Sequence, residues 1–222
     1  MKVLFISKDR DDPYIRNASA FIKDRFPDPL IILVKPGQSI TAEALNWQGD
    51  LLVSYLCPWV LPDSLLGNAS FAAINFHPAT PDYPGTGCTN FAIYNDEKEY
   101  GVMCHHMLPS VDSGKVIAVR RFPVLADDSV YSLTQRCYVQ MLELFYGIIL
   151  DILNGKPLPE SNEHWTRKPY RRSELNALKK LDLNMPVSEI KRRIRATTYP
   201  GTQSAFFEID GMRFEYVPEA KE

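Results

Sequence analysis

Three side chains that can handle protons and stabilise negative charge lie beside turn-forming residues in the middle of the chain. Asn75 and His77 stand two positions apart in Asn75-Phe76-His77-Pro78, and Asp112 follows 35 positions after His77. An amide and an imidazole can donate hydrogen bonds to an oxyanion, and a carboxylate can accept a proton. No nucleophile is obvious next to them in the sequence. The set therefore indicates acyl transfer by direct attack between two bound substrates, without a covalent acyl-enzyme.

Four short apolar runs predict buried strands that position these residues. The runs cover residues 2–6, 30–34, 51–55 and 72–76. Continuous apolar runs suit strands buried on both faces, as in a parallel sheet, and helical spacing of apolar residues after the first run predicts a helix there. The fourth run delivers Asn75 and His77 to its carboxyl end, where ligands bind in open α/β sheets.

The segments around Asp112 predict two more strands and a long helix. Residues 78–87 are rich in proline and glycine and predict a loop, and residues 90–94 can begin a helix. Strands are expected at 102–107 and 116–119, joined by the loop that carries Asp112. From 128 to 154 the apolar residues keep to one helical face, with Asp128 or Ser129 as the cap and Asn154-Gly155 as the stop.

The remainder of the chain predicts a small extension after a linker at 157–159. A short helix is expected over 188–196, with Val187, Ile190 and Ile194 facing inward. A hairpin is expected from 205–209 and 212–217 around Asp210-Gly211. The fold class is therefore α/β with a mostly parallel sheet, plus a small C-terminal helix and β-hairpin extension.

Composition is that of a globular protein outside the membrane. The chain has 222 residues, 45% hydrophobic and 23% charged. No apolar run approaches the ~20 residues that span a bilayer, and the apolar start is too short for a secretory signal, so we expect a cytoplasmic protein. The cysteines Cys57, Cys88, Cys104 and Cys137 are scattered, which predicts reduced thiols and no bound metal.

The net charge of −2 conceals a basic segment between residues 165 and 195. Ten basic residues stand there against three acidic ones, a local charge of +7. Such a segment can meet phosphates, and it can equally form the solvated faces of two helices.

Three linked motifs give the chain a resemblance to a known family. In order they are Asn75-x-His77-Pro78, then Pro81-Asp82-Tyr83-Pro84-Gly85, then Gly101-Val102-x-x-His105-x-Met107-x-x-x-x-Asp112-x-Gly114-x-x-Ile117. This pattern, over roughly residues 50–155, resembles the core signature of the tetrahydrofolate-dependent formyltransferases. The resemblance implies a Rossmann-like catalytic domain over 1–155 and an extension over 156–222. It also implies transfer of a formyl group from N10-formyltetrahydrofolate, without a metal, to a primary amine.

The resemblance assigns roles to individual residues. Asn75 and His77 would stabilise the oxyanion, while Asp112 would keep His77 charged and relay the proton lost by the amine. His105 would support the site from a neighbouring strand. The pterin would lie in a pocket formed by residues 56–60 and 109–112, of which the expected cofactor-binding residues are Leu56, Pro58, Trp59, Val60 and Val111.

The identity of the amine is narrowed by what surrounds the core motifs. Residues 7–13 lack the glycine-rich phosphate loop of glycinamide ribonucleotide transformylases. The 60 residues after Asn162 are too few for the barrel domain of tRNA formyltransferases, although the basic segment keeps initiator tRNA open as an acceptor. The chain is most similar to sugar N-formyltransferases, in the branch acting on 4-amino-4,6-dideoxy sugars such as GDP-perosamine, used in lipopolysaccharide O-antigen biosynthesis.

The resemblance therefore implies a nucleotide-sugar substrate. The aromatic rings of Tyr83, Tyr94, Trp165 or Tyr199 could stack on its base, and of these Tyr83 and Tyr94 are the expected substrate-binding residues. No nucleic acid and no membrane partner are expected, and homodimer formation through the apolar hairpin is a further expectation. Two alternatives stay open, a methionyl-tRNA formyltransferase-like enzyme and a formyltetrahydrofolate hydrolase.

Overall fold

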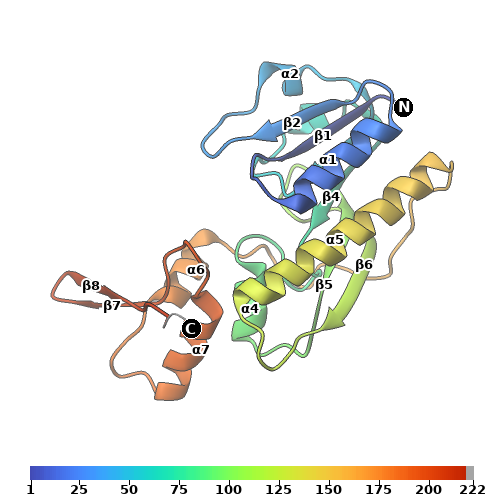
Figure 1. Cartoon of the computed structure of the whole chain (residues 1–222). Coiled ribbons are helices and arrows are strands. Elements are labelled where there is room, and N and C mark those ends of the chain that lie inside the picture. The colour runs from blue at the N-terminus through green and yellow to red at the C-terminus, as the bar shows by residue number, and fades with distance from the viewer. Residues whose placement is uncertain (219–222) are drawn as a thin grey trace.

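The central sheet of the computed structural model, which describes residues 1–218, has six strands in the order β2-β1-β3-β4-β5-β6 (Figure 1). The first four strands in this order, β2, β1, β3 and β4, pair in parallel. Strand β5 is antiparallel to β4, and β6 is antiparallel to β5. In chain order the elements of the first part are β1 (Val3–Lys8), α1 (Pro13–Arg25), β2 (Leu30–Val34), α2 (Ala42–Leu45), β3 (Gly49–Tyr55), α3 (Asp63–Leu66), β4 (Ala69–His77), α4 (Cys88–Tyr94), β5 (Glu99–His106), β6 (Val116–Pro123) and α5 (Val130–Leu153). The predicted α/β class and mostly parallel sheet are confirmed.

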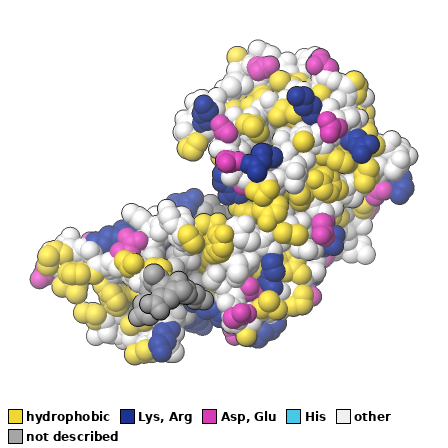
Figure 2. Space-filling model, in the orientation of Figure 1, with side chains coloured by type: hydrophobic (Ala, Val, Ile, Leu, Met, Phe, Trp, Pro, Cys, Tyr) yellow, Lys and Arg dark blue, Asp and Glu magenta, His cyan; other side chains and the backbone are white. Residues whose placement is uncertain are grey.

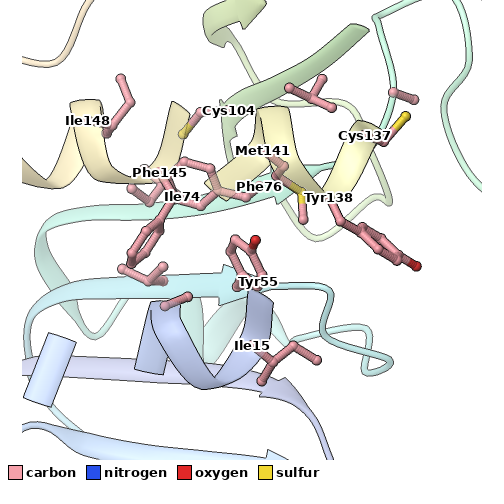
Figure 3. Close-up of a cluster of buried hydrophobic side chains, with 14 of the residues drawn as sticks. Ile15, Tyr55, Ile74, Phe76, Cys104, Cys137, Tyr138, Met141, Phe145 and Ile148 are labelled. Atoms are coloured by element: carbon pink, nitrogen blue, oxygen red, sulfur yellow. The ribbon is translucent and has the colours of Figure 1, made fainter. Parts of the chain in front are cut away.

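Both faces of the sheet are covered, which explains the continuous apolar runs. On one face the long helix α5 and α1 pack against the strands, with Phe145 at the centre of the cluster shown in Figure 3. Phe145 contacts the rings of Tyr55 and Phe76 edge-on, at centroid distances of 5.5 and 5.2 Å. On the other face the short helices α2 and α3 form a smaller core around Trp47.

The two principal helices begin at residues that cap them. The Asp12 side chain accepts a hydrogen bond from the Ile15 amide at the start of α1. Ser129 and Ser132 form a reciprocal capping box at the start of α5, and α5 ends before Asn154, as its sequence predicts. These caps satisfy amides that would otherwise lack partners at the first helical turn.

The residues after 155 run back along the first part and then form an extension at one end of α5 (Figure 1). Its elements are α6 (Arg172–Lys179), α7 (Val187–Thr197), β7 (Phe206–Ile209) and β8 (Met212–Glu215). Helix α7 packs on α4, where the Asn90 side chain donates a hydrogen bond to the Ala196 carbonyl. The expected hairpin is therefore present, and α6 is an element that the sequence patterns did not single out.

One detail of the extension corrects the sequence prediction. Ile190 and Ile194 are half-buried, but Val187 is 66% exposed, because it occupies the first turn of α7 beyond the contact with α4. The hairpin also leaves apolar side chains in solvent, and hydrophobic atoms cover much of it in Figure 2. The division at residue 155 stays a prediction, since the segment after it contacts the first part at several points, through Ser161, Tyr170 and α7.

All four cysteines are free thiols. Within residues 1–218, no helix combines the length and the hydropathy that a membrane span requires. Over the same residues, no group of three or more histidine, cysteine or acidic side chains is arranged to hold a metal ion.

Candidate active site

Asn75, His77 and Asp112 meet at one cavity of about 550 Å³ at the carboxyl ends of β3 and β4. Asn75 and His77 lie two residues apart on β4 and therefore project from the same face of the sheet. Asp112 reaches them from the loop between β5 and β6, and His105 is the β5 residue opposite Asn75. The structure thus brings the three predicted catalytic residues together, with His105 beside them.

The His77 ring is held between a backbone carbonyl and a carboxylate. Its Nε2 lies 3.2 Å from the Tyr83 carbonyl oxygen, and because a carbonyl only accepts, Nε2 carries a proton. Its Nδ1 faces Asp112 Oδ2 at 3.7 Å, a separation that leaves room for a third group to join the two. The Nδ1 position is therefore where His77 can meet a substrate.

The environment favours the charged form of His77. Burial alone would lower the pKa of His77, but the negative charge of Asp112, with hydrogen bonds to Cys88 and the Tyr83 carbonyl, raises it from 6.5 to about 9. The ring is therefore an imidazolium near neutral pH, with protons on both nitrogens. A charged donor at Nδ1 stabilises an oxyanion better than a neutral one.

Asp112 is held in a buried position by three neighbours. Its Oδ2 accepts a hydrogen bond of 2.6 Å from the Gly85 amide, and its Oδ1 lies 3.5 Å from His105 Nε2. Burial would raise the pKa of Asp112, but the charge of His77, the contact with His105 and the Gly85 amide together hold it well below its usual range. A carboxylate of this kind maintains a charged imidazole and passes a proton onward, but does not retain it.

The Asn75 amide has a defined orientation. Ser54 Oγ donates to Asn75 Oδ1 at 2.7 Å, and Asn75 Nδ2 lies 3.0 Å from His105 Nε2. His105 Nδ1 lies 2.7 Å from the His106 carbonyl oxygen and donates to it, and its Nε2 lies between the Asn75 amide and Asp112 Oδ1. Within residues 1–218 Asn75 Nδ2 has no other hydrogen-bond partner, so one of its hydrogens remains for a ligand in the cavity.

The five residues expected to hold the pterin line the same cavity, namely Leu56, Pro58, Trp59, Val60 and Val111. Trp59 is anchored through a 2.6 Å hydrogen bond from Nε1 to the Gln38 carbonyl oxygen. Leu56 has a φ of 56°, a conformation that costs a branched residue of order 1–3 kcal/mol and that clusters at ligand sites. An apolar wall with polar groups at one end suits a flat heteroaromatic ligand.

Tyr83 and Tyr94, the expected substrate-binding residues, do not line this cavity. The Tyr83 ring is 4% exposed, stacks on Tyr170, and donates its hydroxyl hydrogen to Glu97 at 2.5 Å. It has no open face for a base, and Tyr83 serves the site through its backbone carbonyl. The Tyr94 hydroxyl instead donates to Glu189 of α7, beneath the Arg192 guanidinium.

Sequence reasoning missed one neighbour of the site and gave another a different role. Cys88, at the start of α4, lines the cavity, and its thiol is among the groups that raise the pKa of His77. Trp165, which the sequence offered only as a ring that could stack on a base, packs its ring 5.0 Å from His105 and 6.3 Å from His77. Its Nε1 donates to the Gly114 carbonyl oxygen at 2.7 Å. Neither position had a local sequence signal, because each contact joins distant segments.

Two glycines of the motifs are needed for close approach of the backbone. A Cβ on Gly114 would lie 1.8 Å from the His106 carbonyl oxygen. Gly85 has a φ of +86°, and a Cβ there would lie 2.4 Å from the Tyr170 carbonyl oxygen. A side chain at either position would displace the Asp112 loop or its hydrogen-bond partner.

Comparisons with known proteins agree with this geometry. A family model described as formyl transferase matches residues 35–146. The methionyl-tRNA formyltransferase of Latilactobacillus sakei subsp. sakei (strain 23K) is 30% identical over 183 residues, which cover 80% of this chain and 55% of that protein. The chain thus spans about half the length of the curated relatives it matches.

Solved structures share the fold over the whole described chain. A sugar N-formyltransferase from Shewanella sp FDAARGOS_354 has a TM-score of 0.79 at 20% identity, covering 100% of this chain and 99% of that one. A 4-N formyltransferase from Francisella tularensis has a TM-score of 0.80 at 20% identity, covering 100% and 98%. An N-formyltransferase from Helicobacter canadensis, solved with folinic acid and dTDP-3-aminofucose, has a TM-score of 0.73 at 20% identity, covering 95% and 85%.

Proposed function

The chain belongs to the formyl transferase family, and from that premise we propose that it transfers a formyl group from N10-formyltetrahydrofolate to the primary amine of a nucleotide-linked amino sugar. A 4-amino-4,6-dideoxy sugar, as in the GDP-perosamine branch, is the first candidate acceptor. The observation that carries the proposal is the convergence of Asn75, His77 and Asp112 at a cavity with an apolar wall. The solved sugar N-formyltransferases, which share both the sheet and the extension, support the choice of acceptor.

The formyl donor supplies a carbonyl carbon that an amine can attack and a folate nitrogen that leaves. The protein's part is to stabilise the charge that grows on the formyl oxygen. Asn75 would donate its remaining amide hydrogen to that oxygen, and the imidazolium of His77 would donate from Nδ1. Ser54 and His105 hold the amide for this task, and the Tyr83 carbonyl holds the ring.

Proton transfer falls to Asp112. The attacking amine becomes positively charged as the new C–N bond forms, and Asp112 would accept its proton transiently and release it to water or to the leaving folate nitrogen. The low pKa of Asp112 makes such release favourable and preserves the charge pair with His77 for the next cycle.

Leu56, Pro58, Trp59, Val60 and Val111 would contact the pterin, since they form the apolar wall of the cavity. The apolar surface suits the faces of a bicyclic ring, and backbone groups of this segment can meet its polar edge. This placement puts the formyl group toward the end of the cavity that holds Asn75 and His77.

The test is to incubate the protein with N10-formyltetrahydrofolate and a panel of acceptors. The panel holds dTDP-, UDP- and GDP-linked 3-amino and 4-amino sugars, methionyl-tRNA, and a sample with no acceptor. Mass spectrometry of each acceptor and release of tetrahydrofolate are followed together. A mass gain of one formyl group on an amino-sugar nucleotide is the expected result.

Other outcomes of this experiment decide between the alternatives. Formylation of methionyl-tRNA alone would mean that the acceptor is a tRNA and not a sugar. The methionyl-tRNA formyltransferases among the sequence relatives are the observation that supports this alternative. Release of tetrahydrofolate at the same rate with and without acceptors would indicate hydrolysis and would refute transfer. His77→Asn should abolish the activity, whereas His164→Asn, a change of the same kind at an exposed site, should not.

A further inference from the structure

A second cavity of about 430 Å³ adjoins the candidate active site. Five residues line both cavities, namely Lys8, Pro78, Gly87, Cys88 and Arg172. A single ligand can therefore extend from the catalytic residues in the first cavity into the second. Nothing in the assigned chemistry uses the second cavity.

Four cationic side chains from two separate parts of the chain line the second cavity. Lys8 ends β1 and Arg10 follows it, and Arg172 and Lys179 stand at the two ends of α6. Among residues 1–218 no acidic residue lines this cavity, and the adjacent Asp12 is paired with Arg10. Over the same residues Lys8, Arg172 and Lys179 take part in no salt bridge, although Asp12 and Glu215 act on the two lysines from a distance.

The surroundings of Lys8 and Lys179 disfavour the charged forms of both side chains. Burial and the nearby Arg10 lower the pKa of Lys8 to about 8, although Asp12 opposes them. Burial and Arg172 likewise lower the pKa of Lys179, with Glu215 opposing. Like charges that crowd together and lose solvent are stabilised when an anion binds between them.

The loop after β1 supports an anion through side chains and not through its backbone. Residues 7–13 contain no glycine, so a backbone nest for phosphate is not available there. Instead the ring of Tyr138 orients the two cations of this loop, with Lys8 Nζ 5.5 Å and the Arg10 guanidinium carbon 4.9 Å from its centroid. Guanidinium and ammonium groups held in this way recognise phosphate oxygens.

We propose that the second cavity binds the diphosphate of the acceptor, clamped between Lys8 and Arg10 on one side and Arg172 and Lys179 on the other. The inference rests on the proposed function, because the amine of the same molecule must reach Asn75, His77 and Asp112 in the first cavity. It makes helix α6 a part of the substrate site. It also assigns two cations of the basic segment, Arg172 and Lys179, to one ligand, a nucleoside diphosphate.

The test measures binding of nucleoside diphosphates without formyl transfer. Isothermal titration calorimetry follows inorganic pyrophosphate, dTDP, UDP and GDP with the full chain. Lys179→Gln removes a cation that lines only the second cavity, and Arg172→Gln removes one at the junction. Lys180→Gln is the matched control, because Lys180 is the next residue, carries the same charge and pairs with Glu208 outside the cavity.

We expect each cavity variant to weaken the tightest-binding nucleoside diphosphate by about 10-fold or more, as for loss of a charged hydrogen bond. Lys180→Gln should leave the dissociation constant within about twofold. Folinic acid binding and thermal unfolding of Lys179→Gln should match those of the wild type, which shows that the variant is folded. Lys179→Arg, which keeps the charge, should restore most of the affinity.

Two results would overturn the diphosphate site. One is that no nucleoside diphosphate binds to the wild type, and the other is equal affinity in Lys179→Gln, Arg172→Gln and Lys180→Gln. Either result would leave the proposed formyl transfer to an amino sugar standing, because that proposal is tested separately by product formation. Conversely, binding that depends on Lys179 without formylation of any amino-sugar nucleotide would support the diphosphate site and refute the proposed acceptor.

Discussion

Replacing Asp112 by asparagine removes the charge that keeps His77 protonated while conserving the size and shape of the side chain. In the native site Asp112 overcomes the effect of burial and raises the pKa of His77 from 6.5 to about 9. That increase corresponds to about 3 kcal/mol of additional stabilisation of the imidazolium. In Asp112→Asn, only the contacts with Cys88 and the Tyr83 carbonyl still oppose burial, and the pKa of His77 falls to about its ordinary value or lower.

Asp112→Asn then lowers kcat in two ways, through the charge of His77 and through the missing proton acceptor. Near pH 8 at most a few per cent of His77 would remain protonated, a loss of about 30-fold or more in the charged donor. Loss of the proton acceptor adds a factor of about 100 to 10,000. We therefore expect kcat to fall by at least about 1,000-fold at pH 8.

The ratio of wild-type to variant rates isolates the contribution of His77. Protonation of the substrate amine affects both proteins equally and cancels in the ratio. The wild-type ring stays about nine-tenths or more protonated between pH 6 and 8, whereas the variant ring gains protons as the pH falls. The ratio should therefore shrink by about 20-fold or more between pH 8 and pH 6, leaving a residual deficit from the lost acceptor.

The assay is formylation of the acceptor over this pH range, combined with NMR titration of the His77 ring, which needs no substrate. Asp127→Asn, at an exposed position, is the matched control for the same change. An unchanged His77 titration in Asp112→Asn would refute the electrostatic reasoning, as would a rate ratio that does not vary with pH.

Four further predictions concern other residues of the structure. Cys88→Ser should retain transfer within about 10-fold, measured by product formation, since direct attack needs no thiol; a complete loss with native folding would contradict direct attack. Ser54→Ala should lower kcat about 5- to 10-fold with KM unchanged, because it frees the Asn75 amide to rotate; an effect confined to KM would refute this positioning role. Stability should depend on pH: a raised pKa of His77 contributes stability below pH 6.5 that is lost as the pH rises through about 9, so the fall in melting temperature over this range should flatten in His77→Asn. The hairpin leaves Met212 and Phe214 more than half exposed, so we expect a homodimer in sedimentation that Phe214→Ser weakens; a monomer independent of concentration would end that expectation.

Features with a local sequence signal were predicted well. The run at 30–34 matches β2 residue for residue, and the cap and stop of α5 lie where Ser129 and Asn154 indicate. Asn75 and His77 were placed correctly because strand alternation puts them on one face and the carboxyl end of a buried parallel strand is where ligands bind. The motif order then identified Asp112 as the third member.

Features that depend on packing between distant segments were not predictable. Tyr83 was expected to offer its ring, but the loop turns the ring into the core and presents the carbonyl to His77. Trp165 was expected only as a ring that could stack on a base, yet the chain returns across the sheet and places it against His105. The cationic cavity joins the loop after β1 to α6, which no periodicity in either segment could reveal.

The thiol of Cys88 beside His77 raises the question of a covalent route, and the charges of the site argue against it. A thiol is activated by an adjacent base or by uncompensated positive charge. His77 is already protonated near neutral pH, so it cannot take the thiol proton. Its positive charge is balanced by Asp112, whose side chain is as buried as that of His77, at 8% exposure. His77 therefore supplies no base to Cys88, and the same charged pair is the one that stabilises an oxyanion formed by direct attack of an amine.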